Sequence, residues 1–500
     1  METKLKELKT ILGEVSDLST AAALLEWDQQ TYMPPKGATA RGYQMATLQS
    51  IAHSKFTSPE VGQLLEEVEP AVEQLDPDSD DARLVRVTRR DYRKAVCVPS
   101  ELVAELARVT AVAFNIWQEA RAENNFAKFR PHLEKIVELR RRYASLFAPY
   151  DHIYDPLLDD YEPGMKTAEV KTIFDTLRPR QVALIQAIGE QPQVDDRFMH
   201  QHFDEQKQRD FGVEVITRFG YDWQRARQDK SAHPFTTNFS IDDVRITTRF
   251  LSNFFPSAFS SSTHEAGHAF YELGVDPALE RTPLAGGASL ALHESQSRLW
   301  ENLVGRSLPF WEFFYPRLQK VFPAQFSGVS LQAFYKGINK VEPSLIRVEA
   351  DEATYNLHIM LRLELEIALM EGSLEVKDLP EAWNMRMQEY LGITPPNDAQ
   401  GVLQDVHWSG GSFGYFSTYA LGNLISVQLW QKINQEIPDL ADQISRGEFS
   451  VLLGWLRQNV HRYGRKFEPQ ELVERATGSK IDPEPYLLYL ESKFGQIYRL

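Results

Sequence analysis

Apolar residues recur at α-helical spacing along almost the whole chain, and strand-like alternation is scarce. This periodicity predicts helices over residues 5–26, 40–53, 58–74, 80–95, 99–122, 126–147 and 167–189. Turn clusters such as Glu162-Pro163-Gly164 separate the segments, and neither a repeat nor a long linker divides the chain. We therefore expect a mainly α, multi-helix architecture in which all 500 residues form one unit.

The stretch from His233 to Phe259 departs from this helical pattern. Residues 235–239 and 244–250 are rich in β-branched and aromatic side chains, which is typical of short strands. We expect them to form a small antiparallel β-sheet directly before the next helix. The edge of such a sheet can bind an extended peptide as an additional strand.

The pentapeptide His264-Glu265-Ala266-Gly267-His268 predicts a metal site. Residues four apart lie about one turn apart on the same face of a helix, so both imidazoles can reach one zinc ion. Glu265 projects about 100° away and is free to act as a base on water. With 12 histidines in 500 residues, we put the chance of this spacing arising at random at about a few per cent.

We expect this helix to run from His264 to Leu273, with its N-cap supplied by Ser261, Ser262 or Thr263. A second predicted helix, residues 289–304, carries Glu294, 26 positions after His268. A carboxylate from this helix would complete a site of two histidines and one glutamate with an open fourth position. That donor set is typical of catalytic rather than structural zinc.

Hydrolysis at such a site also needs donors for a developing oxyanion. The glycine-rich segment 404–419 leads into a helix and offers His407 and Tyr415 as candidates, although both could equally be packed core residues. Arg347 lies in a charged run, residues 346–352, that we place inside a helix. Its guanidinium could hold a free carboxylate, but the residues alone do not favour it over Arg245, Arg298 or Arg362.

The formal net charge of −16 argues against nucleic acid or an anionic membrane as a partner. No apolar stretch approaches the roughly 18 residues of a membrane span, and the first residues are typical of an amphipathic helix rather than an export signal. We therefore expect a cytoplasmic protein without a membrane partner. The single cysteine, Cys97, excludes an internal disulfide, and its Ala-Val-Cys-Val run indicates a core position.

An ordered series of motifs, taken together, resembles the carboxypeptidase Taq family of zinc metallocarboxypeptidases. The matching segments are Trp27-Asp28-x-x-Thr31-x-Met33-Pro34, Leu158-Asp159-Asp160-Tyr161-Glu162-Pro163-Gly164, His233-Pro234-Phe235, Asp243-x-Arg245-x-Thr247, His264-Glu265-x-x-His268, His293-Glu294-Ser295-Gln296 and Gly401-x-x-Gln404-Asp405-x-His407-Trp408. They run through almost the whole chain. Their order is far more specific than the metal motif alone.

The resemblance implies a nearly all-helical fold with a deep substrate groove, flanked here by residues 1–230 and 231–500 of one peptidase domain. It also implies a homodimer that removes single amino acids from peptide C-termini with broad specificity, using zinc, with cobalt able to substitute. Its implied site residues are the metal ligands His264, His268 and Glu294, the base Glu265, the transition-state donors His407 and Tyr415, and the substrate-binding residues Arg347, Tyr419 (also an alternative phenol), Arg245 and His233.

Two other functions remain open at this point. A related helical zinc oligopeptidase would share the same metal motif but cleave internal peptide bonds. A non-catalytic peptide-binding protein would keep the groove without turnover, which the intact set of ligands and Glu265 disfavours.

Overall fold

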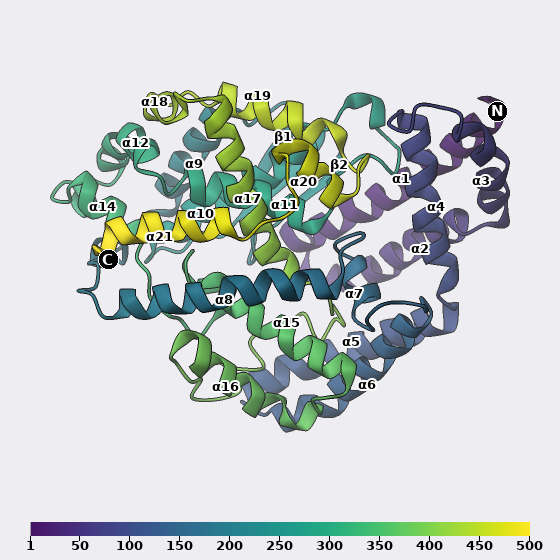
Figure 1. The fold of residues 1–500 in the computed structure, drawn as a ribbon, viewed down its shortest axis with the longest axis horizontal. Helices are drawn as coiled ribbons and strands as arrows, with labels where there is room; N and C mark the ends of the chain where they lie inside the picture. Colours follow the sequence, from purple (N-terminus) through teal and green to yellow (C-terminus); the bar gives the residue numbers. More distant parts are fainter. Residues whose placement is uncertain (1) are drawn as a thin grey trace.

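The structure is a computed structural model that describes residues 2–500, and it is built almost entirely from helices (Figure 1). Before residue 230 these are α1 (Glu2–Thr31), α2 (Ala38–Phe56), α3 (Pro59–Val72), α4 (Asp80–Cys97), α5 (Ser100–Ala122), α6 (Phe126–Ser145), α7 (Asp155–Asp159), α8 (Thr167–Gly189) and α9 (Glu205–Phe219). The mainly α fold is thereby confirmed. All seven helices expected up to residue 189 are present, with ends shifted by a few residues.

The second half of the chain continues in helices. They are α10 (Phe255–Leu273), α11 (Leu290–Arg298), α12 (Leu308–Val321), α13 (Pro323–Phe326), α14 (Leu331–Ile338), α15 (Tyr355–Glu371), α16 (Leu379–Leu391), α17 (Ser417–Glu436), α18 (Leu440–Ser445), α19 (Ser450–Asn459), α20 (Pro469–Thr477) and α21 (Glu484–Tyr498). Directly after α11 the backbone widens into a π-helical segment, residues 299–304. The helix expected over 289–304 is therefore present, but its last part is not α-helical.

A small three-stranded sheet lies between the two sets of helices in the sequence. Its strands are β1 (Ala226–Lys230), β2 (Thr236–Ser240) and β3 (Asp243–Thr248), in the order β1-β3-β2. The expected antiparallel pairing joins β2 to β3, whereas β1 pairs with β3 in parallel, so the sheet is mixed. The sequence pattern missed β1 because its segment, Ala-Arg-Gln-Asp-Lys, lacks the β-branched and aromatic residues that mark strands.

Helix α10 begins nine residues earlier than expected, at Phe255, and the proposed caps lie inside it. The hydroxyl groups of Ser261 and Thr263 instead donate to the carbonyl oxygens of Ser257 (2.6 Å) and Phe259 (3.1 Å), one turn back. Such bonds let serine and threonine stay within a helix. The early start places the metal motif in the middle of a long helix rather than at a fraying end.

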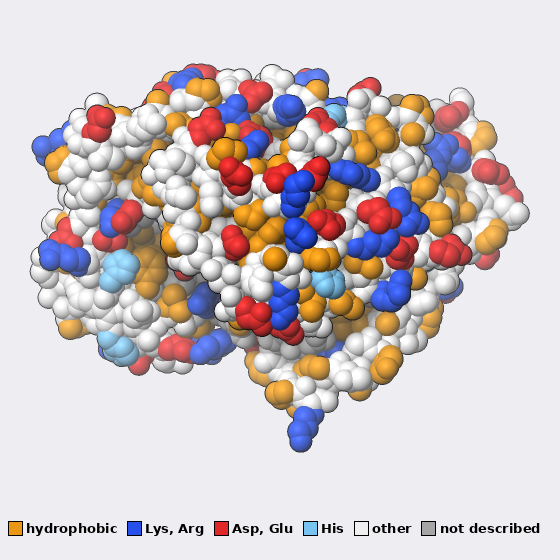
Figure 2. All heavy atoms as spheres, turned by 90° about the horizontal axis from the view of Figure 1, so that it is seen from below, with side chains coloured by type: hydrophobic (Ala, Val, Ile, Leu, Met, Phe, Trp, Pro, Cys, Tyr) orange, Lys and Arg blue, Asp and Glu red, His pale blue; other side chains and the backbone are white. Residues whose placement is uncertain are grey.

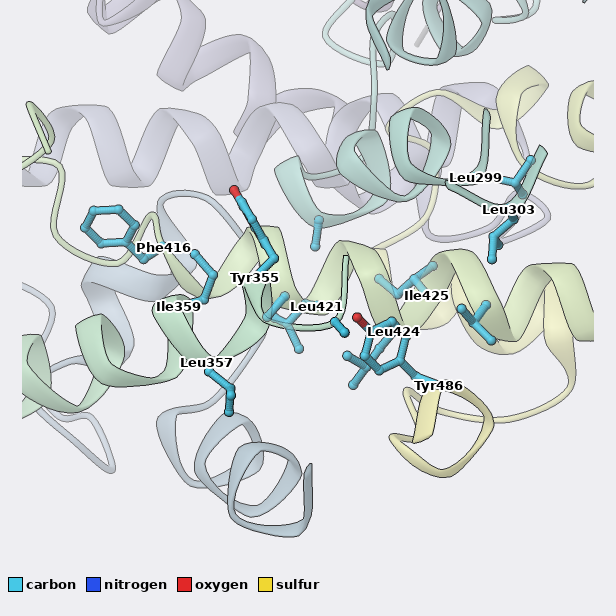
Figure 3. Close-up of a cluster of buried hydrophobic side chains, with 14 of the residues drawn as sticks. Leu299, Leu303, Tyr355, Leu357, Ile359, Phe416, Leu421, Leu424, Ile425 and Tyr486 are labelled. Atoms are coloured by element: carbon cyan, nitrogen blue, oxygen red, sulfur yellow. The ribbon is translucent and has the colours of Figure 1, made fainter. Parts of the chain in front are cut away.

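Helix α17 runs through the main hydrophobic core (Figure 1). Its residues Leu421, Leu424 and Ile425 are completely buried among side chains from α15, α21 and the π-helical segment (Figure 3). A second, smaller cluster joins α1, α3 and α4 to the loop after α10, through residues such as Leu8 and Leu279. Helix α11, which carries Glu294, packs against α17 and is therefore supported on one side by the core.

Two glycines allow three helices to pack more closely than a side chain at either position would permit. A Cβ atom on Gly267 of α10 would lie 2.5 Å from the Gln296 carbonyl oxygen of α11. A Cβ atom on Gly422 of α17 would lie 2.6 Å from Cβ of Glu294, also on α11. Because real Cβ atoms do not approach other atoms this closely, α11 can sit between α10 and α17 only if both positions are glycine.

On the face seen in Figure 2, acidic and basic side chains are interspersed, so the negative net charge is not gathered into one patch there. None of the helices within residues 2–500 is long and apolar enough to cross a membrane.

The expectation that Cys97 is a core residue is wrong. Cys97 is exposed at the end of α4, and its thiol donates to the Leu146 carbonyl oxygen at 3.2 Å.

The close contact at Gly267 leads to a stability prediction. Replacing Gly267 by Ala should lower the free energy of unfolding by about 1–3 kcal/mol, because the methyl group meets backbone atoms of α11 that cannot move aside. The measurement is the urea concentration at the unfolding midpoint. Gly454→Ala, in the middle of α19 with open space around it, is the matched control and should be neutral or slightly stabilising. Equal effects of the two substitutions would contradict the packing argument.

Candidate metal centre

The structure brings His264, His268 and Glu294 together from α10 and α11. Their ligand atoms lie within 4.8 Å of one another. One carboxylate oxygen of Glu294, Oε2, is 3.6 Å from Nε2 of His264 and 3.5 Å from Nε2 of His268. Two imidazole nitrogens and one carboxylate oxygen that converge in this way fit a small divalent cation with nitrogen preference.

Neighbouring side chains orient Glu294 and keep it ionised. Arg298, one turn further along α11, donates from Nε to the other carboxylate oxygen, Oε1, at 2.6 Å. This bond leaves Oε2 facing the two imidazoles. Burial alone would raise the pKa of Glu294, but the charges of Arg298 and His264 hold that pKa well below its usual range.

The π-helical segment supplies a partner for His264 that the sequence pattern did not indicate. Glu301 lies in this segment, and its Oε2 accepts a hydrogen bond from Nδ1 of His264 at 2.9 Å. Arg298 lies 3.1 Å from the same oxygen, and although burial opposes ionisation, its charge lowers the pKa of Glu301 to about 2. A carboxylate on the outer nitrogen of a metal-binding histidine fixes the ring and its tautomer.

Glu265 is bound to the sheet through its carboxylate. The Thr236 hydroxyl of β2 donates to Oε2 of Glu265 at 2.6 Å. The Glu265 side chain is buried, and burial raises the pKa of Glu265 above its ordinary value. A carboxylate that is held in place and more basic than usual is suited to accept a proton.

The loop before α17 and the first turn of that helix bring His407, Tyr415 and Tyr419 together. The ring centroid of Tyr415 lies 5.1 Å from that of His407 and 5.3 Å from that of Tyr419. The Tyr419 hydroxyl is 3.4 Å from Nε2 of His407. Burial lowers the pKa of His407 to about 4, so its ring is neutral at pH 7. Burial also raises the pKa of both tyrosines, which keeps their hydroxyls protonated and able to donate.

A buried acid anchors this loop. Glu366 of α15 accepts hydrogen bonds from Nε1 of Trp408 (2.8 Å), from the backbone N–H of Gly414 (2.9 Å) and from the hydroxyl of Tyr154 (2.5 Å). Two of these donors lie in the loop itself. The loop position is therefore fixed by the core and not by solvent-exposed contacts.

Arg347 is buried, and the expectation that it lies inside a longer helix is wrong. Residues 347–349 form a short 3₁₀ turn, and α15 begins only at Tyr355. Nε and Nη2 of Arg347 both lie 2.9 Å from Oδ1 of Asp405, and Nη1 donates to the Tyr355 hydroxyl at 3.0 Å. The backbone N–H of Arg347 donates to the buried side chain of Gln404 at 2.9 Å, which ties this turn to the segment before α17.

The other arginines that the sequence left open are also paired with carboxylates. Arg298 is bound to Glu294, and Arg362 donates from Nε to Oδ2 of Asp405 at 2.7 Å without any exposed surface. Arg245 forms two bonds of 2.9 Å with Asp243 and stacks on the Trp27 ring. Arg347 differs in its contact with the aromatic cluster: its guanidinium carbon lies 5.1 Å from the Tyr419 ring centroid.

His233 lies in the exposed loop between β1 and β2, and its carbonyl oxygen accepts from the hydroxyl of Ser231 at 2.5 Å. Its side chain makes no hydrogen bond or ion pair to another residue in the described part of the chain. A role in substrate binding for His233, as for Arg245, stays a prediction.

A second buried acid supports the N-terminus of α11. Glu162 accepts from the Ser289 hydroxyl at 2.9 Å and from the backbone N–H of Ala291 at 3.2 Å. Burial raises the pKa of Glu162 to about 8. The protonated form of Glu162 also fits this site, because the Ser289 hydroxyl can accept a hydrogen bond from the carboxyl group as well as donate one.

Comparison with known proteins places this chain in a family. The family model described as carboxypeptidase Taq (M32) metallopeptidase matches residues 7–494. Thermostable carboxypeptidase 1 of Thermus thermophilus is 44% identical, over 99% of both chains.

Solved structures give the same result. The M32 carboxypeptidase of Deinococcus radiodurans superimposes with a TM-score of 0.97 at 40% identity, over 100% of both chains. A structure of the Pyrococcus furiosus carboxypeptidase designated Apo-Mg has a TM-score of 0.95 at 37% identity, covering 98% of this chain and 99% of that one.

Glu162 leads to a prediction of pH dependence. Because the folded-state pKa is about 8 and the ordinary value is 4.5, its contribution to stability is fully present below about pH 4.5 and is lost as the pH rises towards 8. Glu162→Gln keeps the shape but removes this titration. The free energy of unfolding of the variant, relative to that of the wild type, should rise from pH 5 to pH 8 by up to a few kcal/mol, because each pKa unit corresponds to about 1.4 kcal/mol. Both free energies are measured by urea unfolding. Parallel pH profiles of the two proteins would show that Glu162 is ionised throughout.

Proposed function

Because this chain belongs to the carboxypeptidase Taq (M32) metallopeptidase family, and is thus a metallocarboxypeptidase, we propose that it uses zinc to remove single amino acids from peptide C-termini with broad specificity. The observation that carries the proposal is the convergence of His264, His268 and Glu294, whose ligand atoms lie within 4.8 Å. These three residues would hold the metal.

The donor set favours zinc over magnesium. Zinc commonly binds two imidazoles and a carboxylate, whereas magnesium prefers oxygen ligands and keeps several waters. The name of the Pyrococcus structure, Apo-Mg, makes the distinction worth testing for this chain. When bound, zinc would supply Lewis-acid activation of water and of the scissile carbonyl group.

Glu265 would move the proton in the reaction. Its carboxylate accepts a proton from the attacking water and then passes it to the nitrogen of the departing amino acid. Two features support this role: the Thr236 hydroxyl holds one carboxylate oxygen, and burial raises the pKa of Glu265. The raised pKa makes the carboxylate a better proton acceptor and still allows it to release the proton.

A buried excess of positive charge would hold the carboxylate of the substrate. Arg347 and Arg362 share a single carboxylate, Asp405, which leaves this cluster with a net charge of about +1. Although burial opposes ionisation, the two arginines hold the pKa of Asp405 far below its usual range, so Asp405 stays charged. A second carboxylate beside Arg347 would balance the cluster, and the C-terminus of a peptide provides one.

The aromatic cluster would stabilise the transition state. His407, Tyr415 and Tyr419 are neutral hydrogen-bonding groups beside Arg347, and a protonated tyrosine hydroxyl can donate to the oxyanion that forms on the scissile carbonyl. Nδ1 of His407 has no hydrogen-bond partner among the described residues. Either phenol can serve as the donor, so both Tyr415 and Tyr419 remain part of the proposal.

We also propose an organisation for the whole protein. Residues 1–500 would act as one peptidase domain, with regions 1–230 and 231–500 flanking the substrate groove. We further propose a cytoplasmic homodimer in which cobalt can replace zinc. The resemblance of the chain to its family supports these points. An oligopeptidase that cuts internal bonds is the alternative function, and the carboxypeptidase names of the relatives favour the exopeptidase.

Substitution of Glu265 tests whether this residue is the base of the reaction. Glu265→Gln should lower kcat by about 10²–10⁴-fold, because the amide cannot accept the proton, and should leave one zinc ion bound per chain. Peptide hydrolysis and metal content are measured on the same preparation. Unchanged activity would rule out Glu265 as the base.

The substrate carboxylate is tested with a peptide and its C-terminal amide. The wild type should release amino acids one at a time from the free acid and should leave the amide intact. Arg347→Lys should lower kcat/KM for the acid by about 10–100-fold, because the second N–H bond to the carboxylate is lost. Arg83→Lys, at a buried arginine in a two-bond ion pair with Glu471 between α4 and α20, is the matched control and should leave kcat/KM unchanged. Internal cleavage, or equal attack on the amide, would favour the oligopeptidase.

A further inference from the structure

His268 is connected to a carboxylate through a second histidine. Its Nδ1 lies 2.8 Å from Nδ1 of His293, and the two ring centroids are 4.9 Å apart. On the far side of the His293 ring, Nε2 lies 2.5 Å from Oε1 of Glu272. The three side chains thus form one line of hydrogen bonds that ends at a candidate metal ligand.

The local sequence explains how these side chains meet. Glu272 follows His268 by four residues on α10, so it lies on the same face of that helix one turn further on. His293 comes from α11 and directly precedes Glu294. Its ring fits because residue 287 is glycine: a Cβ atom there would lie 2.4 Å from Cδ2 of His293, and the position is therefore shaped for this ring.

Glu272 is itself held in place and accepts from every partner. The backbone N–H of Gly287 donates to Oε1 at 3.1 Å, and the side-chain amide of Asn238 on β2 donates to Oε2 at 2.9 Å. The side chain of Glu272 is only 7% exposed. The group that faces Nε2 of His293 is therefore a fixed hydrogen-bond acceptor.

This arrangement decides where the hydrogens lie. Because Glu272 accepts, Nε2 of His293 must carry the hydrogen, and the Nδ1 atom of a neutral His293 must then be the acceptor. Nδ1 of His268 consequently donates, which leaves Nε2 of His268 without a hydrogen. That Nε2 atom is the one that lies 3.5 Å from Oε2 of Glu294.

We propose that Glu272 and His293 are positioning residues that hold His268 in the tautomer able to bind the metal. The inference rests on the proposed metal site. Without the acceptor at residue 272, His293 can take the other tautomer and present an N–H to His268. His268 would then place its own N–H where the metal must bind. His264 needs no such intermediate, because Glu301 accepts from it directly.

The test compares zinc affinity in variants of the full chain. In Glu272→Leu the acceptor is lost at similar volume, and zinc affinity measured by competition with a chromogenic chelator should fall by about 10–100-fold. His293→Phe, which keeps a ring without nitrogens, should lose a similar amount. Glu272→Gln keeps an acceptor oxygen for His293, while the amide of Asn238 can turn over, so this variant should retain most of the affinity. Glu280→Leu removes a carboxylate that accepts the Ile241 N–H away from the metal ligands, and should bind zinc like the wild type.

A kinetic readout separates positioning from a general loss of structure. In Glu272→Leu the free zinc concentration for half-maximal peptide hydrolysis should rise by the same factor, while saturating zinc restores most of kcat because the metal itself selects the binding tautomer. The melting temperature of the metal-free protein checks folding. Wild-type affinity in Glu272→Leu, or equal losses in the Leu and Gln variants, would overturn the inference alone. Failure of the wild type to bind zinc would overturn the proposed metal site as well.

Discussion

The close contact of α11 with two other helices is the constraint on which the rest of the site depends. Gly267 lets α11 approach α10 and Gly422 lets it approach α17, at distances that no side chain would allow. The first contact brings Glu294 to the two histidines of α10, and the second ties the pair to the centre of the core. A metal centre needs ligand atoms placed to within a few tenths of an ångström, and backbone contact between helices provides that accuracy better than a loop would.

Charge is balanced differently in two parts of the site. Glu294 accepts from Arg298 and is paired with that positive charge. Arg347, by contrast, shares the single carboxylate of Asp405 with a second arginine. Buried charge that is not fully compensated is costly, and a ligand of the opposite sign would offset it. A substrate that ends in a carboxylate would supply that charge beside Arg347.

The sequence predicted what depends on local periodicity and missed what depends on tertiary contacts. Helical spacing was enough to place most helices and to bring His264 and His268 to one face. Nothing local marked the polar strand β1, which lacks β-branched and aromatic residues. Nor did the sequence mark the widening after Arg298 that brings Glu301 to His264, because a single π-helical turn is too short to show its own spacing. Arg347 looked like part of a solvated helix, since a charged run gives no sign that Gln404 and Asp405 will bury it.

We expect one metal ion to bind where α10 and α11 converge. Anomalous diffraction recorded on both sides of the zinc absorption edge, from crystals of the protein purified without added metal, tests this most directly. We expect a single zinc peak at about 2.0–2.2 Å from Nε2 of His264, Nε2 of His268 and Oε2 of Glu294. A peak bound by other residues, or no peak at this position after soaking with zinc, would contradict it.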